Sequence, residues 1–201
     1  ISLIIGAWNY PVLLSMLPLA GSIAAGNCCV LKPSEMAPHV SGLLRELIEG
    51  AFERSYLTVV EGGVEESQQL LEEKSDHIFF TGSPRVGRII MESAAKHLSA
   101  VTLELGGKSP CIVERDADIA LASRRIAWGK WINAGQTCVC PDYLYVHESV
   151  KERLVEGIIH NIGLFYGADP MASPDYCRIV NDRHVERLQR LIDRDKVVYG
   201  G

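Results

Sequence analysis

Residues 77–87 read HIFFTGSPRVG and join a short apolar run to the start of a helix through a glycine turn. The run from His77 to Phe80 is short and rich in β-branched and aromatic residues, which is typical of a strand. Pro84 suits the first turn of a helix, where its missing N–H costs nothing. Strand, turn and helix in this order predict one unit of a parallel sheet.

The same alternation extends over the first half of the chain. Further strands are predicted at residues 1–6, 28–31, 56–60 and 101–105, and helices at residues 11–26, 39–52, 64–74 and 86–98. The first of these helices is expected to be interrupted by Pro18. Five strands alternating with helices predict an α/β fold, a doubly wound parallel sheet with helices on both faces.

The pattern changes after Gly107. Strands are predicted at residues 111–113, 143–146 and 197–201, helices at residues 119–132, 150–165 and 183–193, and a loop at residues 166–174. We therefore expect two domains, residues 1–105 and residues 106–201, the second being part of another α/β domain.

Composition limits the classes of function. The chain has 201 residues, 47% hydrophobic and 22% charged, as in a soluble globular protein, and its net charge of −5 gives no reason to expect a nucleic-acid partner. Its six cysteines show no Cys-x-x-Cys spacing, so we expect no metal site and a reducing, intracellular compartment. The chain begins without methionine and ends in an apolar run, so it reads as a piece of a longer chain.

Polar residues follow the predicted strands at the edge where parallel sheets bind ligands. Asn9 follows the first strand, Lys32 and Glu35 follow the second, and Glu104 ends the fifth. An asparagine can stabilise an oxyanion, and a carboxylate can act as a general base. Each residue taken alone reads equally as a turn, a helix cap or a surface group.

The turn after the fourth strand is a candidate phosphate site, because a helix N-terminus presents free N–H groups. Its residues are Gly82, Ser83, Pro84, Arg85, Val86 and Gly87. The spacing is Gly-x-x-x-x-Gly and not Gly-x-Gly-x-x-Gly, so by itself the motif is weak and an ordinary tight turn competes with it.

Cys138 is the candidate nucleophile. It follows small and polar residues at a predicted helix-to-strand junction, where a thiol can be exposed and reactive. A Cys–His hydrolase using His147 or His160 is an alternative, although both histidines read as ordinary surface residues. Cys140 is too close in sequence for an ordinary intrachain bridge to Cys138.

The motifs together resemble the aldehyde dehydrogenase superfamily, in the family's order. They are Trp8-Asn9-Tyr10-Pro11, Leu31-Lys32-Pro33-Ser34-Glu35, Phe80-Thr81-Gly82-Ser83, Leu103-Glu104-Leu105-Gly106-Gly107-Lys108 and Asn133-Ala134-Gly135-Gln136-Thr137-Cys138. The runs Ala94-Ala95-Lys96-His97-Leu98, Arg125-Ile126-Ala127-Trp128-Gly129-Lys130, Cys138 through Pro141-Asp142-Tyr143, and Asn181-Asp182-Arg183-His184 look like the class 3 branch, which includes fatty and aromatic aldehyde dehydrogenases.

The resemblance implies a Rossmann-like NAD(P)-binding domain at residues 1–105 and a catalytic domain at residues 106–201. It implies that Cys138 attacks the aldehyde, that the Asn9 side chain and the Cys138 N–H hold the oxyanion, and that Glu104 activates water. It implies that Lys32 and Glu35 hold the adenosine ribose of NAD or NADP, and that Gly82 to Gly87 lie under its pyrophosphate.

The resemblance further implies a homodimeric parent that oxidises a medium-chain, long-chain or aromatic aldehyde. The expected location is the cytoplasm, with the endoplasmic reticulum or another membrane surface as the alternative, reached through a tail outside these residues. Family members are longer, so a truncated or spliced product that binds dinucleotide or pairs with full-length subunits without turnover remains an alternative. A thiol acyl-transfer enzyme without a redox step is a third.

Overall fold

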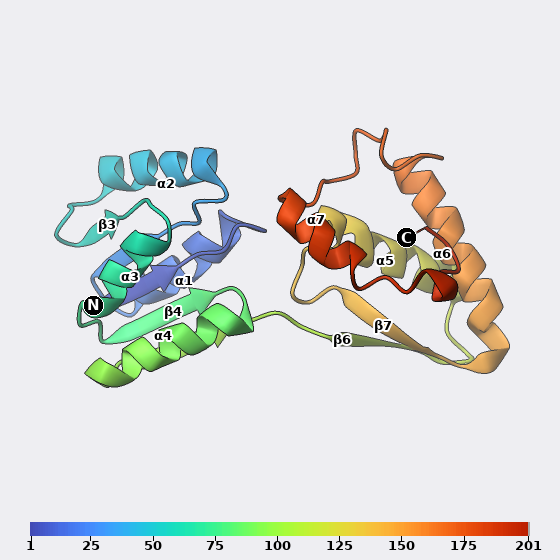
Figure 1. Ribbon diagram of the computed structural model, residues 1–201, viewed down its shortest axis with the longest axis horizontal. Helices are drawn as coiled ribbons and strands as arrows, with labels where there is room; N and C mark the ends of the chain where they lie inside the picture. The colour runs from blue at the N-terminus through green and yellow to red at the C-terminus, as the bar shows by residue number, and fades with distance from the viewer. Residues whose placement is uncertain (201) are drawn as a thin grey trace. The chain divides into compact units, whose positions relative to one another are not determined.

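A five-stranded parallel sheet forms the first part of the chain in the computed structural model, which describes residues 1–200 (Figure 1). The strand order is β3-β2-β1-β4-β5. The strands are β1 (Ser2–Ile5), β2 (Cys29–Lys32), β3 (Leu57–Val59), β4 (His77–Thr81) and β5 (Ala100–Glu104). Every pairing in this sheet is parallel, which confirms the predicted fold class.

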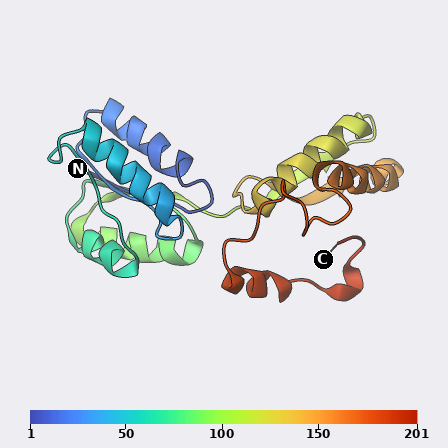
Figure 2. The same ribbon diagram turned by 90° about the horizontal axis from the view of Figure 1, so that it is seen from above.

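Helices cover both faces of this sheet. They are α1 (Leu13–Ala24), α2 (Pro38–Ala51), α3 (Val64–Glu72) and α4 (Pro84–His97). Figure 2 shows α1 and α2 side by side on one face, with α3 and α4 on the other. The two faces have separate apolar cores, one containing residues of α1 and α2 and the other containing residues of α3 and α4.

The central strand β1 shows why this arrangement forms. Leu3 and Ile5 pack in the core beneath α3 and α4, whereas Ile4 packs in the core beneath α1 and α2. Alternate side chains of a strand point to opposite faces, so a continuous apolar run is buried on both sides. Burial of each such side chain contributes about 1.5–3 kcal/mol.

The second unit begins at Gly107, after a first unit of Ile1–Gly106. Its parallel strand pair is β6 (Ser109–Val113) and β7 (Pro141–Val146), connected through α5 (Ile119–Trp131) and the 3₁₀ turn η1 (Ile132–Gly135), and it is followed by α6 (Lys151–Tyr166) and α7 (Asp182–Gln189). Its core joins α5 to α6 around Ala127 and Leu154.

Three expectations about secondary structure need correction. The first helix runs through Pro18 without interruption, because the buried side chain of Leu19 anchors it to the sheet. The helix expected to end at residue 193 ends at Gln189. Residues 197–200 form no strand, since no strand of residues 1–200 pairs with them, and residue 201 of that prediction lies outside the described part.

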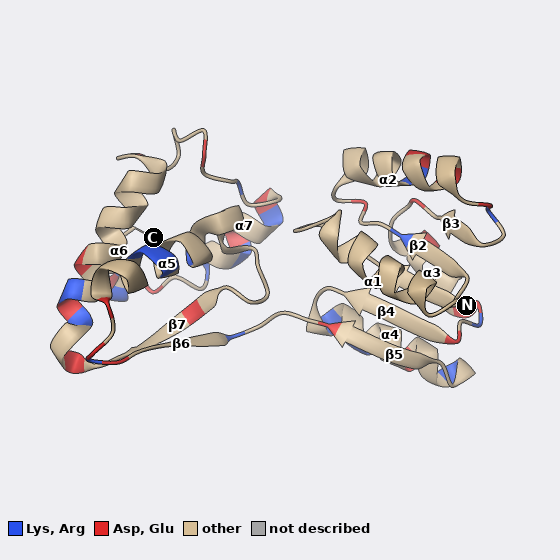
Figure 3. Ribbon diagram, turned by 180° about the vertical axis from the view of Figure 1, so that it is seen from behind, with Lys and Arg blue, Asp and Glu red and all other residues tan. Residues whose placement is uncertain are grey.

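Charged residues of both signs lie on helices of both units, whereas α1 carries none (Figure 3). Within residues 1–200, no helix combines the length and apolar character needed to cross a bilayer. The same residues contain no group of three His, Cys, Asp or Glu side chains arranged to hold a metal ion.

Candidate active site

The residues predicted at strand ends lie at the carboxyl edge of the first unit's sheet. Asn9 follows β1, Lys32 ends β2, Gly82 follows β4 and Glu104 ends β5. The strand order reverses between β1 and β4, because the chain passes from β1 to β2 on one side and returns to β4 on the other. Ligands of open parallel sheets bind beyond the carboxyl ends at such a reversal.

Lys32 and Glu35 form an ion pair at this edge. The Lys32 side chain is 3% exposed, its Nζ lies 2.9 Å from Glu35 Oε2, and the Glu35 side chain is 48% exposed. Partial burial raises the pKa of Glu35, but the hydrogen bond from Lys32, a backbone hydrogen bond and the positive charge of Lys32 together outweigh it and hold the pKa below its ordinary value. The carboxylate is therefore ionised at neutral pH and open to a ligand.

This pair has the donors and acceptors that a ribose needs. An ammonium has three donor hydrogens, and the hydrogen bond to Glu35 uses one of them. The carboxylate has further acceptor capacity for ribose hydroxyls. A buried ammonium gains from additional acceptors, so the residues present fit the adenosine ribose of a dinucleotide.

Two buried hydroxyls that the sequence analysis did not select also lie near the strand reversal. Ser15 on α1 and Thr81 at the end of β4 are buried, and neither hydroxyl has a hydrogen-bond partner within residues 1–200. Ser15 Oγ would be 2.5 Å from a Cβ placed on Gly6, just after β1. The sequence gives no sign that a serine inside an apolar helix occupies this position, because only the fold brings Ser15 beneath the end of β1.

Two hydrogen bonds hold the turn at Gly82. The Gly82 N–H donates to the Glu104 carbonyl oxygen at 3.0 Å, and the Ser83 hydroxyl caps α4 by accepting from the Val86 N–H at 3.3 Å. Pro84 and Arg85 are exposed at the start of α4. The exposed first turn of α4 is the part of this motif that is accessible to an anion.

Gly87 has a packing role in the same motif. It is buried in α4, and a Cβ at this position would lie 3.0 Å from Leu105 Cδ2 and 3.5 Å from Leu103 Cδ1. The glycine therefore permits close packing between the helix and the strand. Its predicted contact with a cofactor stays a prediction.

Glu104 occupies the predicted strand end, paired in register with Thr81. Its side chain is exposed within residues 1–200, so the partial burial expected of a general base is not seen. Asn9 is half-buried in the bend that precedes α1. The catalytic roles of both residues stay predictions.

Cys138 follows an unusual turn in the second unit. Asn133 and Ala134 have φ values of 52°, and Gly135 has a φ of 74°. A left-handed backbone costs roughly 1–2 kcal/mol at an ordinary L-residue, less at asparagine and least at glycine. Two hydrogen bonds of 3.0 Å, from the backbone N–H and the side-chain Nε2 of Gln136 to the Asn133 carbonyl, hold the turn.

Gly107 packs directly against the backbone of Cys138. A Cβ added at Gly107 would overlap the Cys138 carbonyl oxygen and would lie 3.3 Å from its carbonyl carbon. Only glycine permits this approach. The second glycine of Gly106-Gly107 therefore fixes the position of the candidate nucleophile, a role that the sequence analysis did not assign.

Cys140 is buried beside the same turn and has a structural setting. Its Sγ lies 3.5 Å from the Gly135 carbonyl oxygen and 3.9 Å from Lys130 Nζ. The carboxylate of Asp142, near the start of β7, pairs with both Lys130 and Lys108. Cys138 is half-buried, so of these two thiols it is the one more accessible to a substrate.

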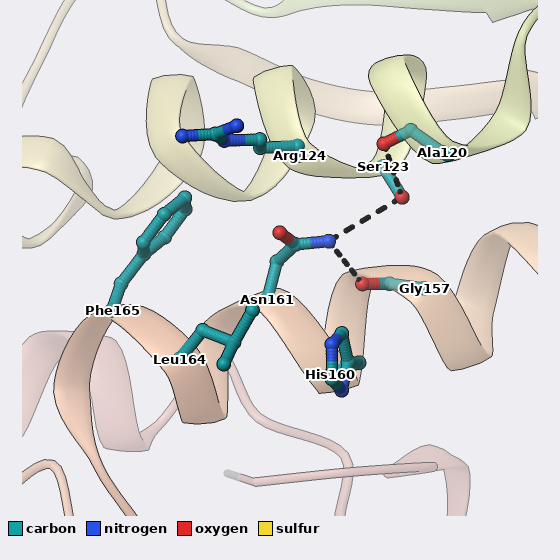
Figure 4. A pocket seen from close by; sticks show the side chains of 8 residues that line it. All are labelled: Ala120, Ser123, Arg124, Gly157, His160, Asn161, Leu164 and Phe165. Carbon is teal, nitrogen blue, oxygen red and sulfur yellow. Dashed lines mark hydrogen bonds between the residues drawn. The ribbon is translucent and has the colours of Figure 1, made fainter.

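An open groove of about 560 Å³ lies between α5 and α6, and it is lined by none of the residues predicted for aldehyde oxidation or cofactor binding (Figure 4). Asn161 Nδ2 donates to the Gly157 carbonyl of its own helix at 2.7 Å and to Ser123 Oγ of α5 at 3.5 Å, and the second of these bonds joins the two helices. His160 lines the groove on α6. We assign the residues that line this groove a role in packing α5 against α6.

Comparison with known proteins gives a consistent result. The model of the aldehyde dehydrogenase family matches residues 1–200. The dimeric NADP-preferring aldehyde dehydrogenase of Rattus norvegicus is 52% identical over 199 residues, covering 99% of this chain and 44% of that protein. Aldehyde dehydrogenase family 3 member A2 of Mus musculus is 50% identical, covering 99% of this chain and 41% of that protein.

Solved structures agree with these relatives. The substrate-bound AldH of Staphylococcus aureus has a TM-score of 0.93 and 48% identity, covering 100% of this chain and 44% of that one. A Mycobacterium tuberculosis aldehyde dehydrogenase complexed with NAD+ has a TM-score of 0.85 and 31% identity, covering 94% of this chain and 40% of that one. The chain thus spans less than half the length of these relatives, and it belongs to the aldehyde dehydrogenase family.

Proposed function

We propose that the full protein oxidises an aldehyde to the corresponding carboxylic acid with NAD+ or NADP+, using Cys138 as the nucleophile. The observation that carries this proposal is the Cys138 turn, which a backbone contact to Gly107 holds and which leaves the thiol half-buried. Family membership supports the reaction class.

The chemistry of the chain's own residues follows from a thiol at this position. The Cys138 thiolate attacks the carbonyl carbon and forms a thiohemiacetal, and loss of a hydride from that carbon leaves a thioester. Water then attacks the thioester, the carbon–sulfur bond breaks, and the acid and the thiol are released. Asn9 is proposed to hydrogen-bond the oxyanion, and Glu104 to take the proton of the attacking water.

NAD+ or NADP+ supplies, when bound, the acceptor for the hydride. We propose that Lys32 and Glu35 bind its adenosine ribose and that the exposed first turn of α4 binds its pyrophosphate. The Glu35 carboxylate favours a free 2′-hydroxyl, whereas the paired Lys32 ammonium offsets repulsion of a 2′-phosphate. We therefore propose that both cofactors are used.

The substrate class proposed is a medium-chain, long-chain or aromatic aldehyde, by similarity to the class 3 relatives. The Rattus norvegicus relative is named as a dimeric enzyme, and by similarity we propose a homodimer for the full protein. The cysteine composition supports a proposed location in the cytoplasm, with the endoplasmic reticulum or another membrane surface as the alternative.

The test is a matrix of aldehydes against both cofactors, with the full-length protein and its Cys138→Ser variant. The expected result is aldehyde-dependent formation of NADH or NADPH that Cys138→Ser abolishes. The Cys140→Ser variant is the matched control, because that thiol is buried, and it should retain turnover. Full turnover by Cys138→Ser would contradict the assigned nucleophile, and acyl transfer without reduced cofactor would favour the non-redox enzyme.

The same assay distinguishes the non-catalytic alternative. If the 201-residue chain binds NAD+ or NADP+ in calorimetry but shows no turnover while the full-length protein does, the chain retains the cofactor site without the complete enzyme. Loss of dinucleotide binding in Lys32→Met would locate that site at the end of β2. Unchanged binding in this variant would contradict the proposed ribose contact.

A further inference from the structure

The turn that carries Cys138 is joined to a loop far along the chain. This loop runs over residues 167–181, between α6 and α7, and contains no helix or strand. The Arg178 guanidinium closes it, donating to the Tyr176 carbonyl at 2.6 Å and to the Met171 carbonyl at 2.5 Å. The Tyr176 ring packs edge-on against Tyr166, with centroids 4.9 Å apart. The loop is therefore an ordered partner for the turn.

The side chain of Gln136 makes the connection. Its Nε2 donates to the Arg178 carbonyl at 3.1 Å, and its Oε1 accepts from the Val180 N–H at 3.0 Å. One amide thus pairs with a carbonyl and an N–H two residues apart, as a neighbouring strand would. The Cys177 thiol adds a third link at 3.3 Å from Asn133 Oδ1.

The left-handed turn needs such an external hold. Sparsely populated backbone conformations persist only where the surroundings determine them, and here Ala134 lacks the freedom of glycine. Gln136 contacts both the turn and the loop, because the same Nε2 that donates to the loop also donates to the Asn133 carbonyl of the turn. Gln136 is two residues before Cys138, so the position of its amide sets the course of the backbone that leads to Cys138.

We propose that Gln136 is a positioning residue, which clamps the Cys138 turn to residues 178–180 and thereby aligns the thiol for attack. The inference rests on the proposed role of Cys138. The clamp requires a side chain that both donates and accepts, which an amide does and an ionised carboxylate does not. A glutamate at this position would face the carbonyl oxygens of Asn133 and Arg178 without a hydrogen to donate.

The test uses the full-length protein with Gln136→Leu, Gln136→Glu and the control Gln69→Glu, whose glutamine is exposed on α3. Hydrogen exchange of the Val180 amide reports the clamp directly. Steady-state kinetics separates kcat from the KM values for aldehyde and cofactor. A misplacement of about 1 Å costs about 100-fold, so we expect kcat to fall between about 10- and 100-fold in both Gln136 variants.

The expected pattern is faster exchange at Val180 in Gln136→Leu, lower kcat in both Gln136 variants, and an unchanged cofactor KM. Gln136→Glu keeps the acceptor for the Val180 N–H and the size of the side chain, so it tests positioning even if Gln136→Leu fails to fold. Gln69→Glu should match the unmodified protein.

Two results would overturn the inference. Unchanged Val180 exchange in Gln136→Leu would show that the clamp does not hold the loop, and unchanged kcat despite faster exchange would show that it does not position the thiol. Both are distinct from failure of the proposed function, which appears as turnover retained by Cys138→Ser. An inactive Cys138→Ser with fully active Gln136 variants would remove only the positioning role.

Discussion

Replacement of Gly107 by alanine is a direct steric test of how Cys138 is held. The new Cβ would overlap the Cys138 carbonyl oxygen, well inside the 3.0 Å below which real Cβ contacts essentially do not occur. The overlapping atom belongs to the backbone and cannot rotate away, so the turn must move by roughly 1 Å to reach an ordinary contact distance. Overpacking of this kind costs about 1–3 kcal/mol of stability.

The expected effect on turnover is larger than the effect on folding. A displacement of this size at the reacting group lowers kcat about 100-fold, which corresponds to about 2.7 kcal/mol of activation free energy. Cofactor binding should be unchanged, because Lys32 and Glu35 lie in the first unit. The assay is aldehyde-dependent reduction of the cofactor by the full-length protein, with the dissociation constant of NAD+ measured separately by calorimetry.

Gly106→Ala is the matched control. A Cβ at Gly106 meets no atom within 4 Å, and its φ is not in the left-handed region, so this variant should retain normal kcat. If Gly107→Ala and Gly106→Ala had equal kcat values, the Gly107 contact would not position Cys138. If Gly107→Ala weakened cofactor binding as strongly as it lowered kcat, the effect would be a general loss of structure.

Two further predictions concern stability. In Gly157→Ala the Cβ would lie 2.6 Å from Ser123 Oγ and 2.8 Å from Ser123 Cβ, so urea denaturation should show that the free energy of unfolding falls by about 1–3 kcal/mol. The control Gly163→Ala is on the same helix, where a Cβ meets nothing within 4 Å, and it should raise the free energy of unfolding by about 0.5–1 kcal/mol. Equal shifts in the two variants would contradict the packing at Ser123. Because Lys32 holds the folded-state pKa of Glu35 below its ordinary value of 4.5, the pair stabilises the fold at neutral pH, and this contribution is lost as the pH falls through the lowered folded-state pKa. Glu35→Gln should therefore lower the free energy of unfolding at neutral pH but not in acid, and a difference that did not vary with pH would refute this linkage.

The sheet of the first unit was predictable because its signals are local. Runs such as Leu3 to Ile5 are short and apolar throughout, which is the pattern of a strand buried on both faces, and the turn at Gly82 marks the start of α4. Pro18 misled the prediction because its local cost is outweighed by packing of the helix against the sheet. Residues 197–200 misled it because an apolar run becomes a strand only beside a partner.

The details of the candidate site were less accessible to sequence reasoning. Nothing in the residue types places Ala134 in a left-handed conformation, since alanine normally avoids it. The hydrogen bonds of Gln136 reach residues more than 40 positions away, and no periodic pattern records such a pairing. The contact of Gly107 with Cys138 had a partial signal, because a glycine pair after a strand commonly marks a close backbone approach.

The position of β1 in the sheet has a consequence for synthesis on the ribosome. This strand is synthesised before its two neighbours in the sheet, β2 and β4. The strand β2 follows after one helix, whereas β4 begins only at His77. At about 5–20 residues per second, one edge of β1 waits several seconds before β4 can cover it. An uncovered apolar strand edge can pair with other chains. The nascent polypeptide is therefore most prone to aggregation in that interval, and ribosome profiling combined with chaperone capture should find binding that ends once residue 81 has emerged.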